Sequence, residues 1–96
     1  MKKLKTIIYN LKLAKIAKVL EKVKQDGFAL KYASKRLRNN KEVVLEAVKQ
    51  CGFALEFARD ELRKDKEVVL EAVKQDGFAL IFASEELQND IEGKIY

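Results

Sequence analysis

The chain of 96 residues contains no histidine and no proline, and its one cysteine is Cys51. Without histidine it has neither the commonest general base nor the partner of Ser–His and Cys–His nucleophile pairs, and it has no histidine metal ligand. A single cysteine forms no intrachain disulfide, which favours a reducing compartment. These absences predict a cytoplasmic protein that is not an enzyme and has no catalytic, cofactor or metal site.

Long apolar runs are also absent. No stretch reaches the roughly 18 uninterrupted apolar residues that a transmembrane helix needs. Lysines at positions 12, 15 and 18 interrupt any apolar core of a secretory signal near the N-terminus. Apolar residues make up 48% of the chain and charged residues 36%, which is typical of a globular protein, and the length predicts one domain over residues 1–96.

The chain contains instead a 25-residue unit that occurs three times. The segment KEVVLEAVKQ occupies residues 41–50 and again residues 66–75, and Gly27, Gly52 and Gly77 each precede Phe-Ala-Leu. A fixed period of about 20 to 50 residues is typical of stacked repeats, in which each unit buries its apolar face against a neighbour. We divide the chain into an N-terminal capping helix at residues 1–14, repeats at 15–39, 40–64 and 65–89, and a truncated fourth repeat at 90–96.

Each repeat is expected to hold two helices, so the predicted fold is all-α, a short α-solenoid. The first helix of the second repeat covers residues 41–50, with Asn40 as its N-cap and Gly52 at the left-handed C′ position. The second helix covers residues 53–63, with a further cap signal near Asp60 that indicates a break. No stretch in which polar and apolar residues alternate is long enough to predict a strand.

Residues 1–24 carry two apolar faces, rotated from one another by more than a third of a turn. A straight helix would bury both only with partners on both sides. We therefore expect two helices, or one bent helix, that changes direction near Asn10. The residues of the two faces are Leu4, Ile7, Ile8, Leu11 and Ala14 on one, and Leu13, Ile16, Val19, Leu20 and Val23 on the other.

Charge is distributed unevenly along the chain. Residues 1–24 carry eight lysines and one glutamate, a net charge of +7, whereas residues 65–96 carry three lysines and eight acidic residues, a net charge of −5. This asymmetry steers partners or favours head-to-tail contact between copies. The basic head is a candidate for binding nucleic acid or an acidic membrane, with a solvated capping helix as the alternative. The candidate anion-binding residues are Lys2, Lys3, Lys5 and Lys12.

Positions that differ among the copies cluster in the second helix of each repeat. The same position holds Lys31, Glu56 and Ile81 in the three copies, and the positions of Ser34, Lys35 and Arg36 vary in the same way. This variable face is where we expect an unknown protein partner to bind, in the manner of an interaction scaffold. Its candidate residues are Lys31, Glu56, Arg59, Ile81 and Glu85.

Three features invite a chemical interpretation that the sequence does not favour. Cys51 lies at the C-terminal end of a helix, whose dipole disfavours a thiolate, and the sister copies have aspartate there. The Asp-Gly pairs at Asp26 and Asp76 lack the spaced oxygen ligands of a calcium loop. Glu85 and Glu86 are neighbours in a helix and so point about 100° apart, which suits solvated first-turn carboxylates better than a catalytic pair.

The fourth copy stops seven residues after its start. Its first helix is therefore expected to be too short to cover the third copy. The apolar residues near this end are Ile81, Ile91, Ile95 and Tyr96. Either the tail folds back over the third copy, or the end takes part in weak self-association.

The pattern Asp/Asn-Lys-Glu-Val-Val-Leu-Glu-Ala-Val-Lys-Gln-x-Gly-x-Ala-Leu-x-Phe/Tyr-Ala-Ser-x-x-Leu resembles the short tandem repeat catalogued as domain of unknown function 4116. The resemblance covers about residues 15–92. It implies a tandem helical repeat with no activity assigned to it, and it therefore supplies no catalytic residue. The chain departs from the pattern with Lys15 at the acidic cap, Cys51 before the glycine and Ile81 at a usually polar position.

Overall fold

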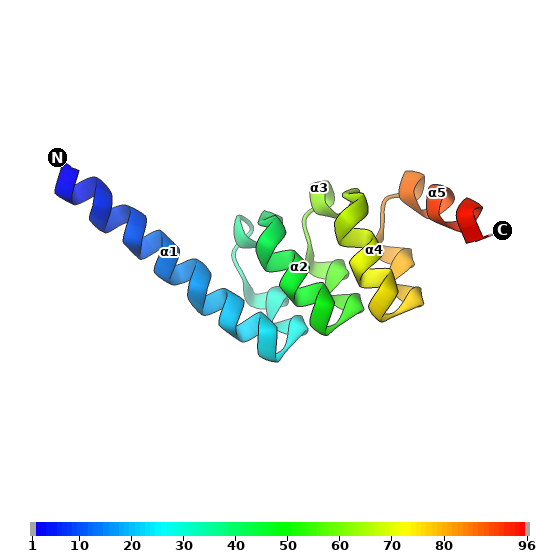
Figure 1. Ribbon diagram of the computed structural model, residues 1–96, viewed down its shortest axis with the longest axis horizontal. Coiled ribbons are helices and arrows are strands. Elements are labelled where there is room, and N and C mark those ends of the chain that lie inside the picture. The colour runs from blue at the N-terminus through cyan, green and yellow to red at the C-terminus, as the bar shows by residue number, and fades with distance from the viewer. Residues whose placement is uncertain (1, 96) are drawn as a thin grey trace.

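A computed structural model describes the backbone of residues 2–95 and the side chains of residues 3–93. Within this range the chain is all-helical and contains no strand (Figure 1), so the predicted all-α class is confirmed. The elements in chain order are α1 (Lys2–Gln25), η1 (Gly27–Tyr32), η2 (Leu37–Asn39), α2 (Lys41–Gln50), η3 (Gly52–Phe57), α3 (Asp60–Arg63), α4 (Lys66–Gln75), η4 (Gly77–Phe82) and α5 (Glu85–Ile95), where η denotes a 3₁₀ helix.

The two copies of KEVVLEAVKQ form α2 and α4, and both begin where the sequence predicts. The side chain of Asn40 accepts a hydrogen bond from the amide of Val43, and that of Asp65 accepts from the amides of Glu67 and Val68. These bonds satisfy amides that have no partner within the helix. The predicted N-caps are therefore confirmed.

The ends of α2 and α4 differ from the prediction. Cys51 and Asp76 have extended backbones, with φ of −148° and −153°, and each starts the 3₁₀ helix that follows. Neither Gly52 nor Gly77 has a positive φ, so the assignment of a left-handed C′ glycine is wrong. The requirement for glycine comes from packing at Gly52, where an added Cβ would lie under 3.0 Å from the carbonyl oxygen of Ala72 in the next helix.

The expected second helix over residues 53–63 is interrupted. Its first part is η3, a 3₁₀ helix that ends at Phe57, and the backbone is extended at Ala58 and Arg59. The four-residue helix α3 then begins at Asp60, where the cap signal indicated a break. Short 3₁₀ helices are common connectors because their poorer hydrogen-bond geometry limits their length.

α1 is a single continuous helix of 24 residues, so the alternative of two helices is wrong. Its C-terminal half packs on the core through Ile16, Val19, Leu20 and Val23. Its N-terminal half projects beyond the other elements (Figure 1), and Leu4, Ile7, Ile8, Leu11 and Leu13 are exposed. Within the described residues, the chain therefore supplies a partner for only the second of the two apolar faces.

The projecting helix makes the molecule elongated. Its principal extents are 57 × 25 × 16 Å, and its radius of gyration is 15.1 Å. A compact domain of this length has a radius of gyration of about 12.5 Å. The difference reflects the length of α1 that lies outside the packed part of the structure.

The core is a column of aliphatic side chains between α1, α2 and α4 and the 3₁₀ helices beside them. The largest side chains with no exposed surface are Leu30, Leu55, Val23, Val43, Val44, Val48, Val68 and Val69. β-Branched and small residues allow the helices to approach closely and to pack with few voids. Among the described residues, none of the buried side chains of this core is charged or polar.

Contacts between successive segments recur at equivalent positions. Phe28 meets Phe57 edge-on with ring centroids 6.1 Å apart, and Phe53 meets Phe82 in the same way at 5.8 Å. Two backbone hydrogen bonds follow the same pattern, from the amide of Arg59 to the carbonyl of Arg38 at 3.0 Å and from Ser84 to Arg63 at 2.9 Å. Aromatic edge contacts of this kind add to the stabilisation from burial.

The C-terminal part differs from the expected start of a fourth repeat. α5 continues through Asp90, whereas new helices begin after the corresponding residues Asn40 and Asp65. Ile91 is 6% exposed and belongs to the core, and Asp90 forms an ion pair with Lys66 at 3.4 Å. The burial of Ile91 agrees with the alternative in which the tail folds back on the chain, whereas Ile81 is exposed. The side chain of Ile95 and all of Tyr96 lie outside the described residues.

Candidate functional site

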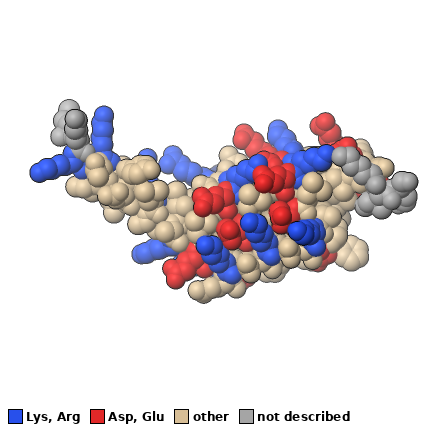
Figure 2. Space-filling model, in the orientation of Figure 1, with Lys and Arg blue, Asp and Glu red and all other residues tan. Residues whose placement is uncertain are grey.

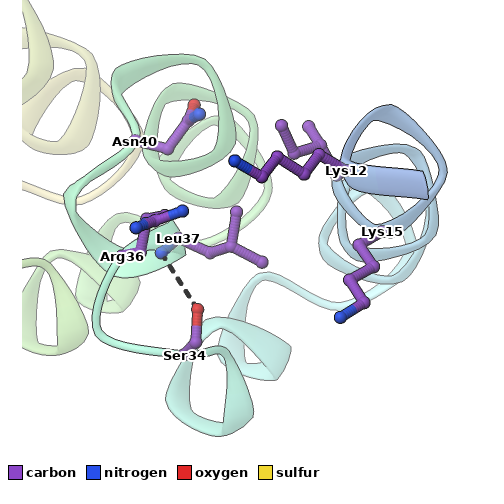
Figure 3. Close-up of a pocket in the computed structure, with 7 residues that line it drawn as sticks. Lys12, Lys15, Ser34, Arg36, Leu37 and Asn40 are labelled. Carbon is purple, nitrogen blue, oxygen red and sulfur yellow. Dashed lines mark hydrogen bonds between the residues drawn. The ribbon is translucent and has the colours of Figure 1, made fainter. Parts of the chain in front are cut away.

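The principal pocket lies between α1 and the segment that leads into α2 (Figure 3). It has a volume of about 430 Å³. α1 supplies one wall and the turn around η2 supplies the other, so the pocket exists because the two segments pack together. The lining residues are Lys12, Lys15 and Ile16 from α1, and Ser34, Arg36, Leu37 and Asn40 from the opposite wall.

The polar part of this basic pocket is cationic. Lys12, Lys15 and Arg36 all contribute to the lining, and no acidic side chain does so among the described residues. In Figure 3 the Lys12 side chain extends from α1 toward Asn40, and Lys15 extends on the side of Ser34. Three cations around one hollow attract an anion, and their mutual repulsion is relieved when it binds.

Two further polar side chains in the pocket are already engaged with the backbone. The hydroxyl of Ser34 accepts a hydrogen bond from the amide of Leu37 at 3.2 Å, and the Asn40 carbonyl oxygen accepts from Val43 at 3.1 Å. The side-chain NH₂ group of Asn40 is a further hydrogen-bond donor of a lining residue. Ile16 and Leu37 supply an apolar surface. The pocket therefore suits an anion such as a phosphate or carboxylate that carries an apolar portion.

The structure separates the three predicted anion-binding side chains that it describes. Lys12 lines the basic pocket, whereas Lys3 and Lys5 are exposed on the projecting half of α1. The side chain of Lys2 lies outside the described residues. No single site therefore gathers Lys3, Lys5 and Lys12.

Sequence reasoning missed Arg36 as a residue that lines the same pocket as Lys12 and Lys15. Comparison of the copies contains a signal for Arg36, because the two later copies have Glu61 and Glu86 at this position. Only the first copy is basic there. The sequence does not show that Arg36 and Lys12 line the same pocket, because this depends on how α1 packs against the turn around η2.

The predicted protein-binding residues are all exposed. Lys31, Glu56 and Ile81 occupy the same position in η1, η3 and η4. Arg59 and Glu85 lie beside the starts of α3 and α5. Figure 2 shows basic and acidic side chains side by side over the packed part of the molecule, whereas basic ones dominate on the projecting helix.

The aspartates of the Asp-Gly pairs have a structural role. The side chain of Asp26 accepts a hydrogen bond from the amide of Phe28 at 3.0 Å, and Asp76 does the same for Phe78 at 3.0 Å. They cap 3₁₀ helices, whereas the partly buried Cys51 makes no such bond. Across the part of the chain that the structure describes, no group of three or more Cys, Asp or Glu side chains is placed to hold a metal ion. No helix in the same range is both long enough and apolar enough to span a membrane.

Comparison with known proteins identifies one family. The profile described as "Domain of unknown function (DUF4116)" matches residues 18–63 and 65–92, which is more than half of the chain. No curated protein and no solved structure matches. The resemblance expected from the sequence pattern is therefore confirmed, and it brings no activity with it.

Proposed function

Since the chain belongs to the DUF4116 family, a domain of unknown function, we propose that it is a non-catalytic α-solenoid of 25-residue units that binds a protein partner through its variable face. This face consists of Lys31, Glu56, Arg59, Ile81 and Glu85. A cytoplasmic location is part of the same proposal, because a chain with a single cysteine suits a reducing compartment.

The observation that carries the proposal is the division between buried and exposed positions. Leu30 and Leu55, which hold a position that is identical in the copies, are fully buried. The position that differs most in chemical character, held by Lys31, Glu56 and Ile81, is exposed in each copy. A surface whose side chains vary over a constant frame is typical of repeat proteins that bind other proteins. The exposed Ile81 adds an apolar anchor to this surface.

Partner capture with matched variants tests this proposal. We expect Glu56→Arg with Arg59→Glu and Ile81→Lys to lose the partner that the unchanged chain recovers from native lysate. The control is Lys49→Gln with Lys74→Gln, which changes exposed lysines on α2 and α4. Circular dichroism should show the same helix content for all three proteins. Equal recovery by the variable-face variant would contradict the proposal.

The basic pocket supports a second candidate function, the binding of an anionic macromolecular surface, either nucleic acid or an acidic membrane. The specific observation is the convergence of Lys12, Lys15 and Arg36 on one hollow. Binding of this kind weakens steeply as salt is added because counterions are released.

Two variants separate the pocket from the projecting helix. Lys12→Gln with Lys15→Gln and Arg36→Gln removes the pocket cations, and Lys3→Gln with Lys5→Gln removes two cations further along α1. We expect the first variant alone to lose retention on heparin or on vesicles rich in anionic lipid at low salt. Loss only in the second variant would assign binding to the projecting helix, and no retention of the unchanged chain would dispose of this function.

A further inference from the structure

The C-terminal end of the stack exposes a surface that is buried at two earlier places in the same chain. A Cβ added to Gly27 would lie 2.5 Å from the carbonyl oxygen of Ala47, and one on Gly52 would meet Ala72 as closely. At the corresponding Gly77 no atom lies within 4 Å of an added Cβ. α2 and α4 cover the first two glycines, and no described segment covers the third.

The side chains around these glycines show the same loss of cover. Phe53 packs against Phe82, whereas Phe78, at the corresponding position, is 76% exposed. Leu55 is fully buried and its counterpart Leu80 is only partly so. Leu70 is 44% exposed, whereas Leu45 packs against the core. Together these residues form an apolar end surface, defined here as Leu70, Gly77, Phe78 and Leu80.

α5 does not cover this end surface. Its contact with α4 includes the ion pair between Asp90 and Lys66, the first residue of α4. Gly77 follows the other end of that helix. Ten residues of α-helix span about 15 Å, so the Lys66 end is remote from the glycine. Figure 1 shows α5 beyond the upper end of α4 and η4 at the lower end of α4.

The N-terminal end of the stack has a different character. Val43 and Ala47, which face the preceding helix, are fully buried in α2, and the corresponding residues of α1 are the exposed Lys18 and Lys22. Tyr32 holds the position that corresponds to Phe57, the residue that packs against Phe28. Tyr32 is 83% exposed, and its ring lies 5.6 Å from the Lys31 ammonium. Lysines pressed against an apolar end surface would lose hydration. The N-terminal end of a second copy therefore does not present the apolar face that covers Gly27 and Gly52.

We propose that the end surface binds a helix of another protein that carries the same face as α2 and α4, with the pattern Val-Val-x-x-Ala-Val. The alanine of that helix meets Gly77, and an aromatic residue beyond it packs edge-on against Phe78. The inference rests on the proposed solenoid and names the kind of partner that its open end takes. The geometry to be reproduced is that of α4 on Gly52.

A peptide with the sequence of residues 65–89 is the probe, because in this chain that segment contains the helix that covers Gly52. Titrated into the full chain, it should bind saturably and shift the amide resonances of Gly77, Phe78 and Leu80. Gly77→Val in the chain and Ala72→Leu in the peptide should each weaken binding at least tenfold. Gly93→Val is the matched control, because an added Cβ there also meets nothing within 4 Å and the site lies in α5.

An extended chain provides a second test, which does not require the isolated peptide to fold. In this variant, residues 91–96 are replaced by a copy of residues 66–89. Gly77→Val should then lower the melting temperature by several degrees, whereas it should leave that of the original chain unchanged. Equal effects in both chains would overturn the inference. Peptide binding that survives Gly77→Val would also overturn it. So would an increase in mass with concentration, measured without peptide and abolished by Gly77→Val, because that result would show that the end surface binds a second copy.

Failure of the proposed function is distinguishable from failure of this inference. If the variable-face variant retains its lysate partner while the peptide binds at Gly77, the interaction face is wrong and the end surface stands. If the variable-face variant loses the partner but neither the peptide nor the extended chain depends on Gly77, the interaction face stands and the inference about the end surface is wrong.

Discussion

Lys41, the first residue of α2, forms an ion pair with Asp65, the residue that caps α4, with 3.0 Å between Nζ and Oδ2. The same ammonium lies 2.8 Å from a carboxylate oxygen of Glu67 in the first turn of α4. Lys66 and Asp90, at the corresponding positions, are 3.4 Å apart, although Asp90 lies within α5 and caps no helix. The cap of one helix is thereby tied to the start of the helix before it.

This ion pair predicts acid sensitivity at Asp65. Partial burial by itself would raise the pKa of this carboxyl, but hydrogen bonds from Lys41 and from the amides of Val68 and Glu67 leave the pKa below its ordinary value. A depressed folded-state pKa contributes stability that is present above the unfolded value and is lost as the pH falls through the folded value. Stability should therefore decline below about pH 4.

Asp65→Asn is the matched variant for that measurement, because Asn40 already caps α2 with an amide side chain. In urea titrations from pH 6 to pH 2, the variant should lose less unfolding free energy in the acid range than the unchanged chain does. Asp60, whose pKa is lowered by a hydrogen bond from Arg63, remains in both proteins and sets the residual slope. Parallel curves would contradict the assignment to Asp65.

Gly52→Ala should destabilise the fold. The added Cβ would press on the carbonyl of Ala72, and backbone on both sides must shift to relieve the contact. Overpacking of this kind costs about 1–3 kcal/mol. Thermal or urea unfolding measures the loss, and Gly77→Ala, which meets open space, should change little. Equal stabilities of the two variants would show that the close approach is not required.

Cys51→Asp should stabilise the chain. Asp26 and Asp76 cap their 3₁₀ helices through the amides of Phe28 and Phe78, and Cys51 provides no such bond to the corresponding helix. A restored cap is worth about 0.5–1 kcal/mol. Melting temperatures of Cys51→Asp and Cys51→Ala should differ, with the gain confined to aspartate. A gain of the same size with alanine would point to the thiol itself.

Ile91→Ala should be costly and Ile81→Ala should not. Ile91 is 6% exposed in the core, and truncation of a buried isoleucine to alanine costs about 2–5 kcal/mol. Ile81 is 65% exposed, and surface changes usually stay within about 0.5 kcal/mol. Unfolding by urea compares the two directly. Similar small effects would mean that α5 does not pack on the rest of the chain in solution.

The sequence by itself determined the parts of the fold that depend on nearby residues. It predicts the all-α class and the starts of α2 and α4, because the bonds that cap a helix join residues two or three positions apart, as from Asp65 to Glu67 and Val68. It also predicts part of the division between core and surface, because Leu30 and Leu55, at a position identical in the copies, are buried and the variable Glu56 is exposed. The shared residue Phe78 is nevertheless 76% exposed.

The tertiary structure decided what depends on residues distant in the chain. Glycine at position 52 looks like a helix terminator until Ala72 is seen against it, since only packing shows how closely two backbones approach. The basic pocket exists because Lys12 and Arg36 come from segments that meet in space. Asp90 resembles the cap Asp65, yet α5 runs through it. A cap residue favours a helix start, but the packing around it decides whether the chain turns there.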